Sequence, residues 1–407
     1  MTTTPDETPA PPPPRLGLRE PLTPVVDTDD ALARACAEIA LGEGPIALDA
    51  ERASGYRYSQ RAYLVQVRRE GAGTWLIDPI AFPDLNELND AFGDAEWILH
   101  AATQDLPCLA EVGLHPMSLF DTELAGRLLN LPRVGLAALV EHYLGMSLAK
   151  EFSAADWSTR PLPDPWLEYA ALDVEVLLEL REAVKADLVA AGKEHWAHEE
   201  FESLLSFTGP PVRHEPWRRT SGIHKLRSRR ALAIVRALWE TRDEIAADRD
   251  VTPGRILPDA SIVALATHVP ATLSALRDDP TMRRRGPRRF LDDWYDAIGS
   301  AQTLDDDELP TTGQRSDGPP PPRAWADKDP VAAERLSRVR AVVSQIAEDH
   351  DVPAENLVSP AFVRALAWQP PADLDPASIA EELRSRGSRA WQIDLVAAPI
   401  AAALVDP

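Results

Sequence analysis

The chain has 407 residues, 44% of them hydrophobic, which is enough for two or three domains with buried cores. Its two cysteines, Cys36 and Cys108, cannot form a disulfide framework, and no cysteine and histidine cluster has the spacing of a zinc site. The N-terminus carries acids and prolines, unlike a signal peptide, and the apolar stretch at residues 393–405 is too short to span a bilayer. We therefore expect a soluble, cytoplasmic protein with no membrane partner and no evident obligate protein partner.

A formal charge of −23 at pH 7 argues against a nucleic-acid partner, because attraction to phosphate normally requires a basic surface. The positive charges are, however, unevenly distributed. Residues 213–242 contain nine lysines and arginines against two glutamates, and residues 281–290 contain five arginines and no acid. Two solvated helix faces explain these basic islands as well as a nucleic-acid surface does, so the choice depends on the motifs.

In chain order, the first predicted elements are short strands separated by glycine, proline and aspartate, at Ile46–Glu51, Tyr63–Arg68, Thr74–Asp78 and Trp97–Ala101. Helical periodicity follows at Leu106–Val112, Thr122–Leu129 and Leu136–Tyr143. One long helix is then predicted from Pro165 to about Ala190, with Asp164 as its cap. Strands followed by interleaved helices indicate an α/β domain.

The chain beyond residue 212 has no strand pattern and contains an internal repeat. Residues 245–251 (IAADRDV) match residues 346–352 (IAEDHDV), and the same offset pairs Ile262 with Val363 and Leu265 with Leu366. An ungapped match of this length indicates a duplicated helical domain, with coincidence between helices rich in alanine and aspartate as the alternative. The predicted division is a disordered proline-rich tail at 1–22, the α/β domain at 23–212, helical domains at 213–303 and 328–407, and a flexible acidic and proline-rich linker at 304–327.

Candidate chemistry begins on the first predicted strand, where Asp49 and Glu51 are two residues apart. Residues at this spacing on a strand point to the same face, so the two carboxylates would lie side by side. A divalent cation between them would relieve their repulsion, and hard oxygen ligands suit Mg²⁺ or Mn²⁺. Taken alone, an Asp-x-Glu pair is more often an exposed strand end.

Two further motifs follow, each with its own ordinary explanation. His100 and Asp105 flank the point where the fourth strand ends and a helix begins, near the strand ends where α/β sites form. Asp105 is otherwise an ordinary helix cap, and His100 a structural histidine. Tyr169 and Asp173 are four residues apart in the long helix and therefore share one face. The ordinary explanation is an aromatic residue packed inside the protein with an acid at the boundary of the core.

The order Asp-x-Glu, His-x₄-Asp, Tyr-x₃-Asp resembles the DEDD exonuclease superfamily in its tyrosine form. Within that superfamily, the segments Asp121–Glu123 and Asp156–Leu162 resemble ribonuclease D, and the resemblance covers residues 25–190. The two helical repeats look like HRDC domains, which follow the nuclease in a similar arrangement in ribonuclease D. The implied fold is an α/β ribonuclease H-like exonuclease domain, a mixed sheet with flanking helices, followed by two small all-α HRDC-type domains. Ala50, where relatives often carry a hydroxyl residue, and the acidic net charge depart from the family pattern.

The resemblance implies a metal-dependent 3′→5′ exoribonuclease that releases nucleoside 5′-monophosphates from RNA with a free 3′ end, such as a transfer RNA precursor. Two divalent ions, Mg²⁺ or Mn²⁺, would be held by four carboxylates, those of Asp49, Glu51, Asp105 and Asp173. Tyr169 would orient the attacking water, since a phenol with a pKa near ~10 is a poor base at neutral pH. Substrate contacts are expected from His100 and Gln104 and from the basic residues Arg218, Arg219, Lys225, Arg227, Arg229 and Arg230.

Two other functions remain open at this point. A 3′→5′ exodeoxyribonuclease of the same superfamily is possible because the metal site does not read the sugar. A non-catalytic RNA-binding protein on a nuclease fold belongs to a different class, and the intact acids and Tyr169 argue against it. A purely structural protein would leave the acids unexplained.

The second repeat is more acidic than the first, so a packing role is expected there, with Trp368 and Trp391 in its core.

Overall fold

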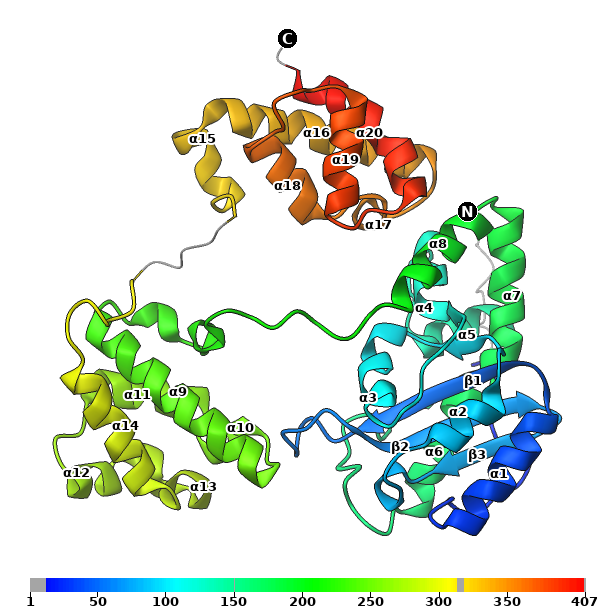
Figure 1. Ribbon diagram of the computed structural model, residues 1–407, viewed down its shortest axis with the longest axis horizontal. Helices are drawn as coiled ribbons and strands as arrows, with labels where there is room; N and C mark the ends of the chain where they lie inside the picture. Colours follow the sequence, from blue (N-terminus) through cyan, green and yellow to red (C-terminus); the bar gives the residue numbers. More distant parts are fainter. Residues whose placement is uncertain (1–11, 150, 313–317, 406–407) are drawn as a thin grey trace, which may run out of the picture.

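The computed structural model describes residues 12–149, 151–312 and 318–405, which form an α/β unit and two helical units (Figure 1). A five-stranded sheet in the order β3-β2-β1-β4-β5 underlies the α/β unit. Its strands are β1 (Glu43–Arg52), β2 (Ala62–Glu70), β3 (Gly73–Ile77), β4 (Trp97–Leu99) and β5 (Leu119–Asp121). The four predicted strands are confirmed, whereas β5 is too short to give a pattern in the sequence. No helix within the described ranges is long and apolar enough to cross a membrane.

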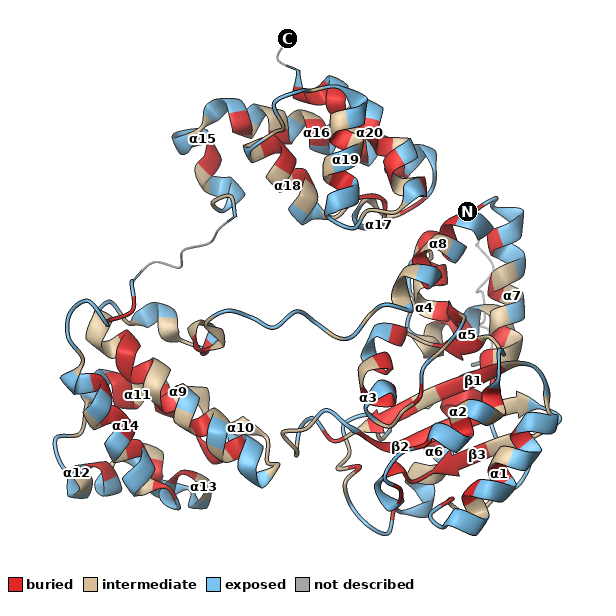
Figure 2. Ribbon diagram, in the orientation of Figure 1, coloured by how far each residue is buried: buried red, intermediate tan, exposed pale blue. Residues whose placement is uncertain are grey.

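Strand pairing in the sheet is mixed, as the family resemblance implies. β1 pairs antiparallel with β2 and β2 antiparallel with β3, whereas β4 runs parallel to β1 and β5 parallel to β4. β1 is therefore the middle strand. Because side chains alternate along a strand, Leu48 and Ala50 enter the main hydrophobic core, while Asp49 and Glu51 lie on the opposite face. The buried strands stand out in Figure 2.

The helices of the α/β unit include the predicted ones, with one correction. They are α1 (Asp29–Leu41), α2 (Asn86–Phe92), α3 (Leu106–Glu111), α4 (Thr122–Leu128), α5 (Leu136–Leu144), α6 (Asp164–Glu175), α7 (Leu177–Ala190) and α8 (Glu194–Leu204). The single long helix predicted from Pro165 to Ala190 is wrong, because one turn residue, Val176 with φ of −111° and ψ of −4°, divides it into α6 and α7. No proline or glycine marks this break. Asp164 is the first residue of α6, and its predicted role as a cap is also wrong, since Pro163 occupies that position.

The two helical units begin with helices of the same order and similar length, as the internal repeat predicts. In the first helical unit these are α9 (Arg229–Arg249), α10 (Pro253–Ile256), α11 (Asp259–His268), α12 (Leu273–Asp278), α13 (Arg285–Arg288) and α14 (Leu291–Thr303). In the second they are α15 (Trp325–Lys328), α16 (Pro330–Asp349), α17 (Ala354–Leu357), α18 (Pro360–Trp368), α19 (Pro376–Ser385) and α20 (Ala390–Leu404). Helices α9, α10 and α11 correspond to α16, α17 and α18. The repeat pairs Ile262 with Val363 and Leu265 with Leu366 are all buried.

Each helical unit contacts the α/β unit through the same position of the repeat. Asp250, directly after α9, accepts hydrogen bonds from the Ser59 amide (2.9 Å) and the Tyr63 hydroxyl (3.2 Å). Its counterpart Asp351, near the end of α16, accepts one from the Asn130 amide group (2.7 Å). Both aspartates have positive φ, 46° and 48°. One turn geometry therefore docks the two repeats on different surfaces of the nuclease.

The second helical unit is further attached through aromatic rings. Trp391 of α20 stacks on Trp196 of α8, with ring centroids 4.5 Å apart and an interplanar angle of 16°. Its indole N–H donates to Glu200 (3.1 Å). Trp368 instead packs on Trp325 within the second unit (4.8 Å). Trp391 is thus a buried residue of the interface between units, and the expected packing role of the second repeat includes contact with the nuclease.

Parts of the segments expected to be flexible are packed against the folded units. Leu16 is buried, and its amide donates to the Ser147 carbonyl (2.9 Å). In the expected linker, Leu309 joins the core of the first helical unit and Trp325 is fully buried in the second. Residues 1–11 of the expected tail and 313–317 of the linker lie outside the described residues.

Candidate active site

Asp49 and Glu51 lie side by side on the C-terminal half of β1. In the antiparallel register with β2, Asp49 is opposite Gln66 and Glu51 is opposite Leu64. Leu64 belongs to a small hydrophobic cluster with Trp157 and Ala170, which separates this face from the main core. Ala50 points the other way and is buried in that main core. The missing hydroxyl at position 50 therefore does not alter the face that carries the two acids.

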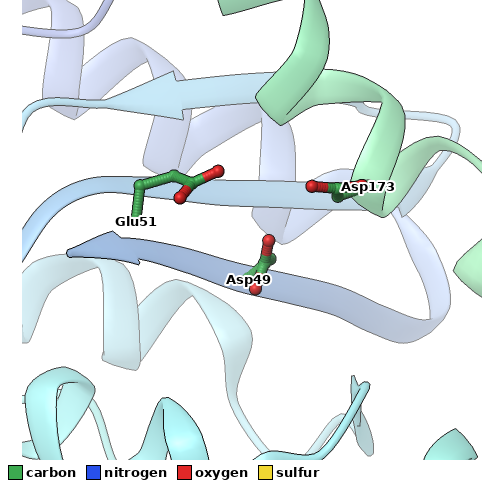
Figure 3. A group of neighbouring side chains, drawn as sticks. All are labelled: Asp49, Glu51 and Asp173. Carbon is green, nitrogen blue, oxygen red and sulfur yellow. The ribbon is translucent and has the colours of Figure 1, made fainter. Parts of the chain in front are cut away.

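Helix α6 brings the third acid to this face. It packs across β1, β2 and β3, and Asp173 projects from it toward the two strand acids (Figure 3). One oxygen atom from each of Asp49, Glu51 and Asp173 lies within 4.8 Å of the others. The predicted spacing of two on a strand therefore places Asp49 and Glu51 side by side, and the packing of α6 on β1 adds Asp173 to form a cluster of three carboxylates from two elements.

The electrostatics of this cluster suit a divalent cation. Burial raises the pKa of Asp49 to about 6, and burial together with the charge of Asp49 raises the pKa of Glu51 to about 10. Burial also raises the pKa of Asp173. Neighbouring buried carboxylates cannot all ionise unless positive charge lies between them. Clustered hard oxygen ligands at low exposure fit divalent cations such as Mg²⁺ or Mn²⁺.

Asp105, the fourth predicted acid, lies beside this cluster without belonging to the group of three. It occupies the N-cap position of α3, but its side chain makes no capping hydrogen bond, so ordinary capping does not explain it. It is 4% exposed, and its nearest cation is Arg52, at 3.8 Å. A register irregularity between Glu51 and Arg52 ends the regular alternation of β1 at this point. Arg52 thus partly neutralises the site, which the sequence did not predict.

The loop that carries Asp105 is held in place by Asp121. The Asp121 carboxylate accepts hydrogen bonds from the amides of Ala101 (3.0 Å) and Ala102 (2.8 Å), and it also caps α4. Ala101 has a left-handed backbone with φ of 61°, which a non-glycine residue adopts only with such support. The segment Asp121–Glu123 resembled the family without an assigned role, and the structure gives Asp121 the role of positioning the Asp105 loop.

The acids open into a cavity of about 590 Å³ that His100, Gln104 and Tyr169 also line. The Nδ1 atom of His100 is 2.9 Å from the Thr122 hydroxyl. Burial lowers the pKa of His100 to about 4, so the imidazole is neutral at pH 7. Burial, followed by the nearby carboxylates, raises the pKa of the Tyr169 phenol above its ordinary value. Both groups therefore face the cavity as neutral hydrogen-bonding partners.

Three of the six predicted basic residues are engaged in the fold of the first helical unit. Arg229 donates to the carbonyls of Asp306 and Leu309, and Arg230 donates to those of Ala301 and Leu304. Arg218 pairs with its neighbour Glu215 (2.6 Å). The remaining three, Arg219, Lys225 and Arg227, are exposed. The guanidinium groups of Arg218, Arg229 and Arg230 therefore stabilise the chain around α9 and α14, which leaves only the other three for contact with substrate.

Three family models match the chain. A 3′-5′ exonuclease model matches residues 24–188, and an HRDC model matches residues 231–298. A model of the C-terminal domain of 3′ to 5′ exonucleases matches residues 318–404. The second helical unit thus matches a model of its own, although it shares the repeat with the HRDC unit.

Several relatives resemble this chain over most of its length. Ribonuclease D of Jannaschia sp. is 34% identical over 262 residues, which cover 62% of this chain and 67% of the relative. A crystal structure of a protein from Bifidobacterium adolescentis is 42% identical with a TM-score of 0.89, covering 96% of this chain and 99% of the other. The crystal structure of Escherichia coli RNase D, described as an exoribonuclease involved in structured RNA processing, is 26% identical with a TM-score of 0.66, covering 89% and 97%.

A mixed sheet with clustered acids, matched by the exonuclease model and followed by an HRDC domain, defines a 3′-5′ exonuclease. This class of hydrolase removes nucleotides from the 3′ end of a nucleic acid. The chain belongs to the ribonuclease D family.

Proposed function

We propose that this protein is a metal-dependent exoribonuclease that removes nucleoside 5′-monophosphates one at a time from the 3′ end of RNA. The observation that carries the proposal is the convergence of the Asp49, Glu51 and Asp173 carboxylates within 4.8 Å of one another. The E. coli relative is described as acting in structured RNA processing, so structured RNAs with a single-stranded 3′ tail, transfer RNA precursors among them, are the expected substrates.

The four acids would hold two divalent ions, Mg²⁺ or Mn²⁺. Asp49, Glu51 and Asp173 already form one group, and Asp105 would join them once Arg52 no longer neutralises it. Bound ions would stabilise charge on the reacting phosphate and lower the pKa of a coordinated water. They would also lower the raised pKa values of these carboxylates, which allows all four to ionise together.

In the proposed reaction, the oxygen of a water molecule attacks the phosphorus of the last phosphodiester. The bond between phosphorus and the 3′ oxygen of the penultimate nucleotide breaks, and that oxygen takes up a proton. Tyr169 orients the attacking water with its phenol, which stays protonated at neutral pH because its pKa is raised. Neutral His100 and Gln104, which line the cavity, would hydrogen-bond the terminal nucleotide.

The test is the shortening of 5′-labelled single-stranded RNA and DNA of the same sequence in the presence of Mg²⁺, Mn²⁺ or a chelator. Asp49→Asn and Asp173→Asn should each lower the rate by at least about 100-fold, since each removes a ligand charge. Asp94→Asn, which changes an exposed aspartate away from the acids, is the matched control and should retain the full rate.

A ladder that shortens from the 3′ end only with metal and intact acids would support the proposal. Faster shortening of DNA than of RNA would select the exodeoxyribonuclease instead. Binding of RNA without any ladder would select the non-catalytic alternative. Full activity of Asp173→Asn would refute the assignment of α6 to the metal site.

A further inference from the structure

Five arginines of the first helical unit are exposed and have no ion-pair partner among the described residues. They lie in and beside the short helix α13, between residues 283 and 289, and comprise Arg283, Arg284, Arg285, Arg288 and Arg289. Acids flank the segment at Asp278, Asp279, Asp292 and Asp293, but no ion pair joins them to these arginines in the described part of the chain. In a protein with a formal charge of −23, such uncompensated positive charge is unusual.

This segment is connected to the active-site cavity by a series of direct contacts. α13 packs on α10, and only a glycine fits at position 286, because a Cβ atom there would collide with the Arg255 carbonyl oxygen. The Arg255 guanidinium carbon in turn lies 4.3 Å from the ring centroid of Tyr56. Tyr56 directly follows Ser54 and Gly55, which line the cavity. The arginine segment is therefore on the side of the helical unit that faces the nuclease.

Three arginines of the other basic island, Arg227, Arg229 and Arg230, lie at the opposite end of helix α9. Helix α9 has 21 residues, so its ends are about 30 Å apart. Arg227 precedes its first turn, whereas Asp250, which docks on the nuclease, follows its last turn. Arg227, Arg229 and Arg230 are thus about a helix length away from the docking site, whereas residues 283–289 contact α10, which directly follows Asp250.

On the basis of the proposed function, we propose that these five arginines bind the phosphates of the single-stranded RNA that precedes its terminal nucleotide. We call residues 283–289 the arginine track. Guanidinium groups form charge-assisted, often bidentate hydrogen bonds to phosphate oxygens, and each neutralised phosphate releases counterions. The half-buried Tyr56 beside Arg255 adds an aromatic ring next to the cavity-lining Gly55, of the kind on which bases stack. The track holds the RNA while the acids cut its end.

The test compares two variants that lose the same charge. The track variant carries Arg284→Gln, Arg285→Gln and Arg288→Gln. The control carries Arg34→Gln, Arg340→Gln and Arg384→Gln, three exposed arginines on α1, α16 and α19. Steady-state rates are measured with Mg²⁺ on an RNA of about 20 nucleotides and on a trinucleotide, over a range of salt concentrations. Circular dichroism and thermal melting confirm that both variants are folded.

The track variant should raise KM for the long RNA at least about tenfold and leave kcat and the trinucleotide rate unchanged. Its slope of log KM against log salt should fall by about 2, because each lost phosphate contact on a single strand accounts for about 0.7. The control should match the wild type. Equal KM values for the two variants on the long RNA would overturn the track, as would an equal loss on the trinucleotide. If the wild type itself shows no metal-dependent shortening, it is the proposed function that fails.

Discussion

The docking of the first helical unit can be tested at one residue, Asp250. Its carboxylate accepts hydrogen bonds from the Ser59 amide and the Tyr63 hydroxyl, both in the α/β unit. Its backbone has φ of 46°, a conformation that strains most residues but not glycine. Asp250→Gly therefore removes both hydrogen bonds without adding backbone strain.

The size of the effect follows from these two hydrogen bonds. A hydrogen bond to a charged group contributes about 1.5–3 kcal/mol, and partial exposure of Asp250 reduces this to about 1 kcal/mol each. Their loss costs about 2 kcal/mol, which shifts the docking equilibrium about 30-fold toward the separated state. The hydrogen bonds from Tyr58 to Asp243 and from Thr252 to Tyr56 remain and keep some docking.

Hydrogen exchange measures this shift. Amides of residues 54–61 should exchange faster in Asp250→Gly, by up to about 30-fold, while the amides of α9 keep their protection. The repeat supplies a matched control, Asp351→Gly, which should leave residues 54–61 unchanged and expose residues near Asn130 instead. Unchanged exchange at 54–61 in Asp250→Gly, with α9 intact, would refute the assigned docking.

The docking should also depend on pH. Burial alone would raise the pKa of Asp250, but hydrogen bonds from Ser59 and Tyr63 outweigh it and lower the pKa. Because the pKa of Asp250 is lower in the docked state, its carboxylate stabilises docking fully at pH values above the ordinary pKa of about 3.9. This stabilisation is lost as the pH falls through the lowered pKa of the docked state. Docking that stayed equally strong below about pH 3 would contradict this assignment.

Three further results are expected. Tyr169→Phe should lower kcat by about tenfold or more and leave the shape of the pH profile of kcat unchanged. The reason is that the phenol has a raised pKa and, in the proposed role, orients water without titrating. If the variant lost the change of kcat at high pH that the wild type shows, Tyr169 would instead act as a base. Trp391→Ala should cost about 3–5 kcal/mol in the free energy of urea unfolding, and Trp391→Phe distinctly less, since the stacked ring contributes most. Burial raises the pKa of Glu200 despite Arg389 and Trp391, so the folded state favours the protonated form of this carboxyl group. Because the wild type loses stability as Glu200 ionises, Glu200→Gln should become more stable than the wild type as the pH rises above about 4. A difference in melting temperature between the two proteins that does not change with pH would contradict the raised pKa.

The faces that carry the acids could be predicted from the sequence because they rest on local periodicity. A spacing of two residues on a strand and of four on a helix fixes which side chains share a face. This spacing places Asp49 and Glu51 side by side, whereas the tertiary contact of α6 with β1 brings Asp173 to them. The hydrophobic alternation of β1 also explains why Ala50 points away from the acids. The repeat at residues 245–251 and 346–352 was predictable for a similar reason, since it preserves the end of a long helix.

What could not be predicted depends on contacts between distant segments. The pairing of Arg52 with Asp105 requires the irregularity at the end of β1, which no residue type signals. Arg229 and Arg230 looked like a basic surface, yet their donors reach carbonyls about 70 to 80 residues further along the chain. A basic residue's partners, and hence its availability to a substrate, are fixed by tertiary structure and are invisible in composition.

The duplicated aspartate turn explains how one nuclease carries two related helical units with different roles. Asp250 docks beside the loop that lines the cavity, whereas Asp351 docks at Asn130, and the Lys193 ammonium also donates to the Asp351 carbonyl (2.6 Å). Trp391 of the second unit stacks on Trp196 of α8 in the α/β unit, which is a packing contact. The counterpart of residues 283–289 keeps three arginines, and each of them pairs with a glutamate: Arg384 with Glu381, Arg386 with Glu382 and Arg389 with Glu200. The two units thus share one mode of attachment and present different surfaces, and the proposed RNA contact falls on the unit that docks beside the cavity loop.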